Sequence, residues 1–178
     1  MKKLLLLAFA VLSLNAFALS VNVGASYQKA SFTTDTGLFD AISGDNVHDY
    51  DDPVLALNVE LTQGFIFGEL GLGASYEQGY SINDIVKYDA VPVYGIAKIN
   101  LFPIGIKPYI SAKYGTVLYL NQENIDLDNG QYVSIGLGVT LIDTLQLEGS
   151  LNANKTKDSD GTELVNGSYG LTVRYNTY

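Results

Sequence analysis

The sequence predicts an all-β fold, an eight-stranded antiparallel up-and-down transmembrane β-barrel, and three observations lead to this prediction. Residues 65–77 divide strictly by parity into an apolar face and a face of Gly, Ser and carboxylates, as expected when successive side chains point to opposite sides of a strand. The alternation recurs in seven further segments, and the connections between segments alternate between short and long. Both features are typical of a barrel whose apolar surface faces lipid.

The first 18 residues have the pattern of a secretory signal peptide. Lys2 and Lys3 precede an apolar run over residues 4–14, and Ala16-Phe17-Ala18 forms an A-x-A cleavage site. The apolar run is too short for a membrane helix, and no later stretch supplies the ~20 consecutive apolar residues that such a helix needs. We therefore expect a signal peptide over residues 1–18 and one outer-membrane β-barrel domain over residues 19–178.

The charge balance of the chain excludes some partners. Without the two signal lysines, 8 basic residues stand against 19 acidic ones, a formal charge of −11. This makes nucleic acid an unsuitable partner, because binding to it depends on basic side chains. The chain contains no Cys, so no disulfide framework holds the fold.

The predicted elements follow one another along the chain without interruption. The strands cover residues 20–31, 53–62, 65–77, 90–101, 106–119, 131–141, 145–154 and 167–178. The longer loops are residues 33–52, 79–89, 121–130 and 155–166, and the tight turns are Gln63-Gly64, 102–105 and Asp143-Thr144. Because the chain ends and the short turns share one rim, we expect that rim to be periplasmic and the long loops to face outward.

Each predicted strand has one apolar and one polar face. The apolar faces contain, in order, Val21, Val23, Ala25 and Tyr27; Leu55, Leu57, Val59 and Leu61; Ile66, Leu70, Leu72, Ala74 and Tyr76; Val133, Ile135, Leu137 and Val139; Leu145, Leu147 and Leu151; and Tyr169, Leu171, Val173 and Tyr175. Phe65 falls on the polar face of its strand. For strands 90–101 and 106–119 the polar faces decide the assignment, because these contain Lys98, Asn100, Lys107, Tyr109, Ser111 and Lys113.

The charged residues determine which face points inward. Seven of them lie on the Gly, Ser and Asn face: Glu60, Glu69, Lys98, Lys107, Lys113, Glu148 and Arg174. Exchanging the two faces would turn four basic groups toward lipid, at about 2–4 kcal/mol each near the midplane. Pro92 and Pro108 lie inside predicted strands, so we expect both near rims, where ladder hydrogen bonds stop or a bulge intervenes.

The chain resembles the small eight-stranded outer-membrane barrels typified by the OmpA transmembrane domain and OmpX. The resemblance rests on the signal segment, the GELGLGASY strand, the alternation of loops and the terminal aromatic Tyr178. It implies an aromatic girdle, which this chain must build without Trp. We expect Tyr27, Tyr76 and Tyr169 near the outer rim and Phe102 and Tyr175 near the inner one. In this chain the apolar residues of the last strand have the opposite parity to Tyr178, which implies a terminal bulge or a weaker assembly signal.

The charges of the polar face form the first candidate site, a lumen charge network. It consists of Glu60, Glu69, Lys98, Lys107, Lys113, Glu148 and Arg174. The network is either a functional gate or simple filling of a narrow lumen. Glu148 and Arg174 lie about four residues from the periplasmic ends of consecutive strands, so we expect them to form a pair. Strand shear could instead bring Arg174 next to Glu60 or Glu69.

A second candidate site lies in the acidic loop over residues 33–52. This loop carries six Asp residues and no Lys or Arg. Asp49, Asp51 and Asp52 offer the oxygen ligands that a hard metal cation such as calcium requires, and the alternative is a solvated acidic loop. The only His, His48, lies in the same loop without a catalytic motif around it. No phosphate-binding glycine loop and no other cofactor motif is present.

These observations predict a non-enzymatic outer-membrane protein with a structural or surface-binding, adhesin-like role, whose four loops are exposed at the cell surface. The alternatives are a narrow channel for ions or small solutes and, less strongly indicated, a lipid A-modifying enzyme. The expected location is the cell outer membrane. The expected partners are outer-membrane lipid or lipopolysaccharide and, through the loops, host or cell-surface ligands, and the expected state is a monomer.

Overall fold

The computed structural model describes residues 19–34, 48–49, 53–65, 67–82, 86–102, 106–123, 128–141, 144–157, 161 and 163–177. The strands in these residues are β1 (Leu19–Thr34), β2 (His48–Asp49), β3 (Val54–Phe65), β4 (Gly68–Ile82), β5 (Val86–Asn100), β6 (Lys107–Glu123), β7 (Gly130–Leu141), β8 (Leu145–Lys157) and β9 (Glu163–Thr177). Within the described residues, no helix is long and apolar enough to cross a membrane.

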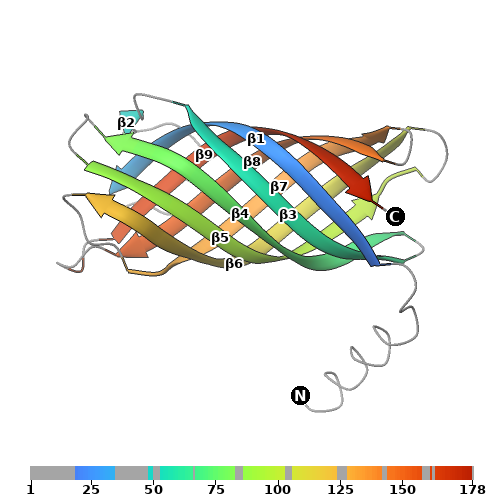
Figure 1. The fold of residues 1–178 in the computed structure, drawn as a ribbon, viewed down its shortest axis with the longest axis horizontal. Helices are drawn as coiled ribbons and strands as arrows, with labels where there is room; N and C mark the ends of the chain where they lie inside the picture. The colour runs from blue at the N-terminus through green and yellow to red at the C-terminus, as the bar shows by residue number, and fades with distance from the viewer. Residues whose placement is uncertain are drawn as a thin grey trace, which may run out of the picture.

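Eight long strands form a closed antiparallel barrel. Each strand from β3 to β9 pairs with the next one along the chain, β1 pairs with β3, and β9 closes the barrel by pairing with β1 over residues 21–34. Figure 1 shows the cylinder, with the C-terminus and the short connections at one end and β2 at the other. The predicted fold class is confirmed.

The two faces of the sheet differ as the sequence predicts. Outward-facing Leu72 is 69% exposed, whereas inward-facing Glu60 has no exposed surface. Exposed large apolar residues occur on all eight long strands, and most of the buried side chains of the lumen are polar or charged. Apolar surface of this extent on a monomer requires a non-aqueous environment, so the outer face is the surface that contacts lipid.

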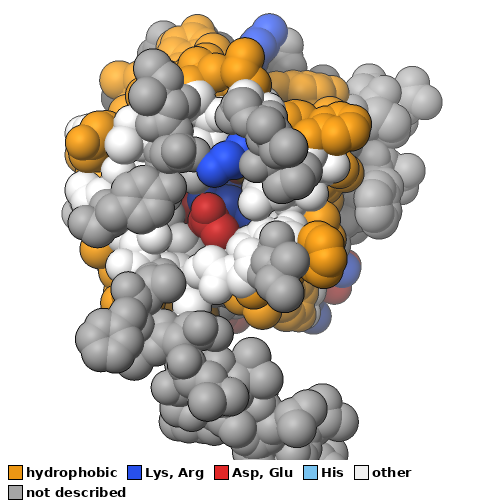
Figure 2. Space-filling view, turned by 90° about the vertical axis from the view of Figure 1, so that its right-hand side faces the viewer, with side chains coloured by type: hydrophobic (Ala, Val, Ile, Leu, Met, Phe, Trp, Pro, Cys, Tyr) orange, Lys and Arg blue, Asp and Glu red, His pale blue; other side chains and the backbone are white. Residues whose placement is uncertain are grey.

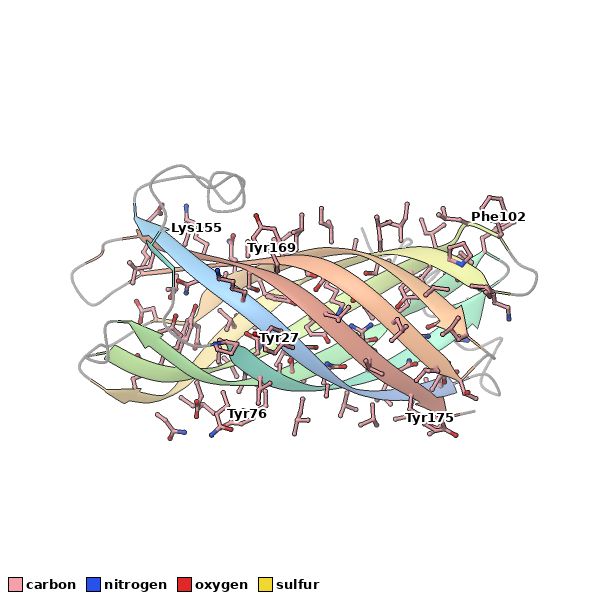
Figure 3. All side chains as sticks on the ribbon, turned by 90° about the horizontal axis from the view of Figure 1, so that it is seen from above. Tyr27, Tyr76, Phe102, Lys155, Tyr169 and Tyr175 are labelled. Carbon is pink, nitrogen blue, oxygen red and sulfur yellow. The ribbon has the colours of Figure 1, made fainter. Side chains whose placement is uncertain are left out.

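The predicted girdle residues all lie on the outer surface. Tyr27, Tyr169 and Tyr175 are more than half exposed, as is Phe102, and Tyr76 is 38% exposed. Figure 3 shows Phe102 and Tyr175 toward the end with the short turns, and Tyr76 and Tyr169 toward the opposite half. Tyr178, the predicted terminal aromatic, lies outside the described residues.

The strands extend further than predicted at the end with the long connections. β4 continues to Ile82 and β5 begins at Val86, so most of the predicted loop 79–89 is strand. β6 continues to Glu123, and β8 and β9 reach Lys157 and Glu163. Hydrophobic alternation marks only the part of a strand that lipid covers. Beyond that level polar residues continue the ladder, because neighbouring strands still satisfy the backbone groups.

Two predictions near the first hairpins are wrong. The turn is not at Gln63-Gly64, because Phe65 pairs with Gly68 and the chain reverses between these two residues. This register places Glu60 opposite Gly73, where a Cβ added to the glycine would lie 3.0 Å from Glu60 Cγ. In the same register Phe65 ends β3 on the outside of the barrel, instead of facing the lumen as predicted. The predicted loop 33–52 also contains β2, which pairs with Ser31 and Phe32 beyond the end of the β1–β3 ladder.

The two strand prolines occupy sites where ladder hydrogen bonds are interrupted. Pro108 lies near the short-turn rim, one residue beyond the last β5–β6 pair, Asn100↔Tyr109. Pro92 lies in the middle of β5, so its expected place near a rim is wrong. On β4, Pro92 has no paired residue, because it lies between the pairs Ala74↔Val93 and Glu77↔Ala90. An amide donor is therefore not needed there.

Two bulges meet at Asp89 on β5. On β4, Gln78 and Gly79 stand opposite Asp89 alone, and on β6 a second shift in register follows Leu120. Gly79 has φ +90° and Asn121 has φ +51°. The Asp89 carboxylate accepts hydrogen bonds from the Tyr76 hydroxyl (2.8 Å), the Asn121 amide (2.6 Å) and the Gly79 backbone N–H (3.2 Å). One side chain thus joins the irregular positions of three neighbouring strands.

Candidate functional site: the lumen charge cluster

The seven predicted lumen residues come from six strands. Glu60 lies on β3, Glu69 on β4, Lys98 on β5, Lys107 and Lys113 on β6, Glu148 on β8 and Arg174 on β9. Six of them form one group of ion pairs, which we call the lumen charge cluster (Glu60, Glu69, Lys98, Lys113, Glu148 and Arg174). Lys107 is the first residue of β6, where it is half-buried at the short-turn rim.

Glu60 is at the centre of the cluster. Its carboxylate lies 3.0 Å from Lys98 Nζ, 3.2 Å from Lys113 Nζ and 3.3 Å from Arg174 Nε. The three cations come from three different strands, and the Glu60 side chain has no exposed surface. A carboxylate this deeply buried is stable as an anion only when several cations or donors surround it.

Glu148 is the second buried acid. Its Oε1 lies 2.8 Å from Arg174 Nη2 and 3.3 Å from Lys113 Nζ. Lys113 and Arg174 therefore each bridge the two acids, so two of the three partners considered for Arg174, Glu148 and Glu60, are in contact with it. The third acid, Glu69, lies 3.6 Å from Lys98 Nζ. Within the cluster, three acids and three bases balance one another.

Neutral side chains complete the coordination of the cluster. The Tyr94 hydroxyl donates to Glu60 Oε1 at 3.2 Å, and Lys98 Nζ donates to Gln146 Oε1 at 3.0 Å. Arg174 Nε donates to Asn58 Oδ1 at 3.2 Å, and the ammonium of Lys113 lies 5.1 Å from the centre of the Tyr94 ring, within the range of a cation–π contact. Sequence parity places Asn58 and Gln146 on the polar face. It does not show that they touch the charges. Tyr94 has the parity of Lys98, but nothing in the sequence indicates that its hydroxyl reaches Glu60.

Glycines leave the space that these long side chains occupy. An added Cβ at Gly73 would lie 2.6 Å from the Tyr94 ring, and one at Gly24 would lie 2.6 Å from Arg174 Cγ and from Asn58 Oδ1. Contacts below 3.0 Å force a neighbour to move. Gly24 and Gly73 therefore have a local role, because each stands beside a large lumen side chain.

Polar side chains continue the packing toward the long-loop end. Gln28 Nε2 donates to Glu77 Oε1 at 3.2 Å, and its Oε1 accepts from Ser168 Oγ at 2.9 Å. Asn152 donates to Ser168 at 3.1 Å and accepts from the Tyr132 hydroxyl at 3.3 Å. This layer lies above the charge cluster and ties β1, β4, β7, β8 and β9 together across the lumen.

The space left between the two layers is small. A cavity of about 10 Å³ lies between residues of both layers, including Gln28, Glu77, Lys113 and Arg174, which is room for about one water molecule. Figure 2 looks along the barrel from the short-turn end and shows acidic and basic side chains at its centre, with hydrophobic side chains around the perimeter. The arrangement holds charges firmly in the middle of the barrel and offers no space for a substrate there.

The predicted cation site cannot be placed. Asp51 and Asp52 lie outside the described residues, and of Asp49 and His48 the structure describes only the backbone of β2. In the portion of the chain that is described, no three His, Cys, Asp or Glu side chains are grouped in a way that could hold a metal ion.

Solved structures of outer-membrane barrels resemble this fold. Neisserial surface protein A (NspA) has a TM-score of 0.57 at 12% identity, covering 87% of this chain and 96% of that one. Ail, the attachment invasion locus protein of Yersinia pestis, has a TM-score of 0.51 at 12% identity and covers 90% of this chain and 100% of its own. The outer membrane enzyme PagL has a TM-score of 0.52 at 13% identity, with 84% and 97% covered.

These likenesses establish the fold, that of a small outer-membrane β-barrel. It is the fold that the resemblance in the sequence predicts. No protein-family model matches the chain, and no curated protein sequence matches it either. The similar structures include a surface protein, an attachment protein and an enzyme, so the fold alone does not choose among these functions.

Proposed function

We propose that this chain is a non-enzymatic outer-membrane protein whose barrel is a closed, rigid scaffold for surface loops that bind an external partner. The observation that carries the proposal is the filled lumen. Six charged side chains from six strands neutralise one another at its centre, and the cavity beside them measures about 10 Å³. A barrel packed in this way is suited to holding loops in fixed relative positions.

The alternative of a narrow channel has less support. Conduction requires a continuous polar path, and the buried ion pairs of Glu60 and Glu148 occupy the cross-section where such a path would run. Breaking these pairs leaves uncompensated buried charge, which opposes spontaneous opening. An enzymatic role would need a group of reactive side chains, and the described residues on the lipid-facing surface are mainly apolar.

The names of two similar structures, a Neisserial surface protein and an attachment protein, support a role at the cell surface. We place the external contact of this chain in the four longer connections. The first, residues 33–52, has six Asp and no basic residue. Its partner is therefore a cationic surface, or an anionic one that is bridged through a divalent cation held by Asp49, Asp51 and Asp52.

The binding role can be tested with the folded protein in detergent micelles. We expect it to bind host-cell monolayers or lipopolysaccharide-coated surfaces, and protease trimming of the loops to abolish that binding while the barrel stays intact. Unchanged binding after trimming would contradict the role of the loops. In planar bilayers we expect no steady conductance, and lipid A analysed with and without the gene should have the same mass; a steady current or a mass difference would favour the channel or the enzyme.

A further inference from the structure

The outer surface of the barrel has an apolar groove over β6 to β9. The groove has a volume of about 550 Å³, and its sides include Ile110, Ile135, Leu137, Leu151 and Tyr169. Its floor is the backbone around Gly149 on β8. Because this surface faces lipid, the occupant of such a groove is an apolar chain from the membrane.

The groove exists because one side chain is missing from a row of large ones. Across the sheet, Gly149 pairs with Leu137 on β7 and with Leu171 on β9, and Leu137 pairs with Ile110 on β6. Leu137 and Leu171 are at least 60% exposed, whereas an added Cβ at Gly149 would meet no atom within 4 Å. The gap is thus one side chain wide, the width of a hydrocarbon chain.

Basic residues gather above this groove, at the long-loop end. Three of the eight basic residues that follow the signal segment belong to the lumen charge cluster, and Lys107 lies at the other rim. Lys155 and Lys157 lie on β8, the strand of Gly149, and Lys29 on β1 pairs with Tyr169. Figure 3 shows Lys155 and Tyr169 on the same side of the barrel, with Lys155 nearer the long-loop end.

Two of these lysines share a single acid. Glu163 Oε2 lies 2.6 Å from Lys155 Nζ, and Glu163 Oε1 lies 3.8 Å from Lys157 Nζ. Asp128 lines the same pocket, so the two lysines share it with two acids, and both lysines are more than a third exposed. Each ammonium has three N–H donors, so donors remain for a further anion. Lys155 is four residues from Leu151, about 13 Å along the strand.

We propose that the groove and the Lys155–Lys157 site together bind one molecule of the lipid A part of lipopolysaccharide, a phosphorylated multi-acyl lipid of the outer leaflet. One acyl chain occupies the groove over Gly149, and a phosphate binds the two lysines. The apolar floor lies below the cations along one strand, which matches the order of chain and headgroup in such a lipid. The inference requires only the membrane-spanning barrel and does not depend on what the surface loops bind.

The groove is tested by native mass spectrometry of the folded protein in detergent, titrated with diphosphorylated lipid A. Gly149→Leu fills the gap and should weaken binding about tenfold, the effect of losing about two buried methylene groups. Gly95→Leu is the matched control, because Gly95 is also exposed on the outside and an added Cβ meets its first neighbour at 3.8 Å. Equal affinity of the two variants would overturn the groove. If Gly149→Leu fails to fold, Gly149→Ala is measured in its place, and its loss of affinity for lipid A should be smaller.

The headgroup site is tested by two changes with opposite expected effects. Lys155→Gln with Lys157→Gln should weaken binding of diphosphorylated lipid A about tenfold, since two charge-assisted hydrogen bonds are lost. Glu163→Gln should strengthen it severalfold, because both lysines lose their competing acid. Lys107→Gln, a change at the other rim, should leave the binding of diphosphorylated lipid A unchanged.

Dephosphorylated lipid A and phosphatidylcholine provide the specificity controls. Neither should bind the wild type as tightly as diphosphorylated lipid A, nor respond to the lysine substitutions. Equal binding of all three lipids, or a loss of binding with Glu163→Gln, would show only an ordinary lipid annulus and would overturn the proposal.

Discussion

Arg174 Nη2 lies 2.8 Å from Glu148 Oε1 across neighbouring strands, and both side chains are almost completely buried. Arg174 also contacts Glu60, and Lys113 contacts both acids. The pair is therefore one edge of a larger network, in which removing any member leaves buried charge on the others.

From this contact we expect Glu148→Gln and Arg174→Met each to lower the free energy of unfolding by about 3–5 kcal/mol, the effect of an uncompensated buried charge. The double variant should lose clearly less than the sum, because the two residues interact directly. Urea unfolding in lipid vesicles measures all three values. Lys155→Gln, which breaks an exposed pair, is the control and should cost at most about 1 kcal/mol. Strictly additive losses would contradict the coupling.

The sequence predicts the faces of this barrel well and its register poorly. Parity alone assigns Glu60, Glu148 and Arg174 to the lumen, because lipid does not tolerate charged groups near the membrane midplane. Parity does not determine which residues are opposite one another, since any even shift keeps both faces. The pairing of Glu60 with Gly73, and so the chain reversal between Phe65 and Gly68, follows from the fit of large lumen side chains beside glycines.

Strand ends were hard to predict for a related reason. The hydrophobic alternation fades near Glu77, yet β4 continues to Ile82 through a bulge. Asp89, predicted to end a loop, lies within β5 and joins that bulge to Asn121 on β6. Such contacts depend on three strands meeting, which no local pattern in one strand records.

The lumen glycines lead to a second prediction. Gly73→Ala should lower the free energy of unfolding by about 1–3 kcal/mol, because its Cβ would lie 2.6 Å from the Tyr94 ring in a filled space. Gly95→Ala makes the same chemical change on the outer face, where the first neighbour is at 3.8 Å, and should be close to neutral. Vesicle unfolding compares the two, and equal costs would mean that the lumen is not closely packed at Gly73.

A third prediction concerns Asp89. Asp89→Ala removes an acceptor shared by Tyr76, Asn121 and the Gly79 N–H, and should destabilise the barrel by about 1–3 kcal/mol. The effect should be local, with faster amide exchange at Gly79 and in the adjacent end of β6. Tyr76→Phe removes only one donor and should cost less. Uniform exchange across all strands in Asp89→Ala would argue against a local bulge anchor.

The acidic loop provides a fourth prediction. If Asp49, Asp51 and Asp52 bind calcium, the ion should protect residues 33–52 from protease, and replacing all three with Asn should abolish that protection. The measurement is the rate of loop cleavage with calcium and with a chelator. Replacing Asp35 and Asp40 with Asn is the matched control, as it removes charge from the same loop and should leave the calcium effect in place. Cleavage of the wild type at one rate in both conditions would rule out the site.

The last prediction concerns pH and the exposed pair of Lys155 and Glu163, which lies beyond Tyr169 at the long-loop end. The hydrogen bond from Lys155, 2.6 Å long, holds the pKa of Glu163 below its ordinary value of 4.5. A carboxyl group whose pKa is lower in the folded state stabilises the fold above its unfolded pKa, and this contribution disappears as the pH falls through the folded pKa. We therefore expect the pairing to persist at neutral pH and to be lost below about pH 4.5, with little change in overall stability because the pair is exposed.

NMR titration of the Glu163 side chain should show the lowered pKa in the wild type, a return toward the ordinary value in Lys155→Gln and a smaller upward shift in Lys157→Gln, whose ammonium is 3.8 Å away. If the pKa of Glu163 is unchanged in Lys155→Gln, the hydrogen bond from Lys155 is not what lowers it. Glu163 would then not compete with a lipid phosphate for the two lysines, as our lipid proposal requires.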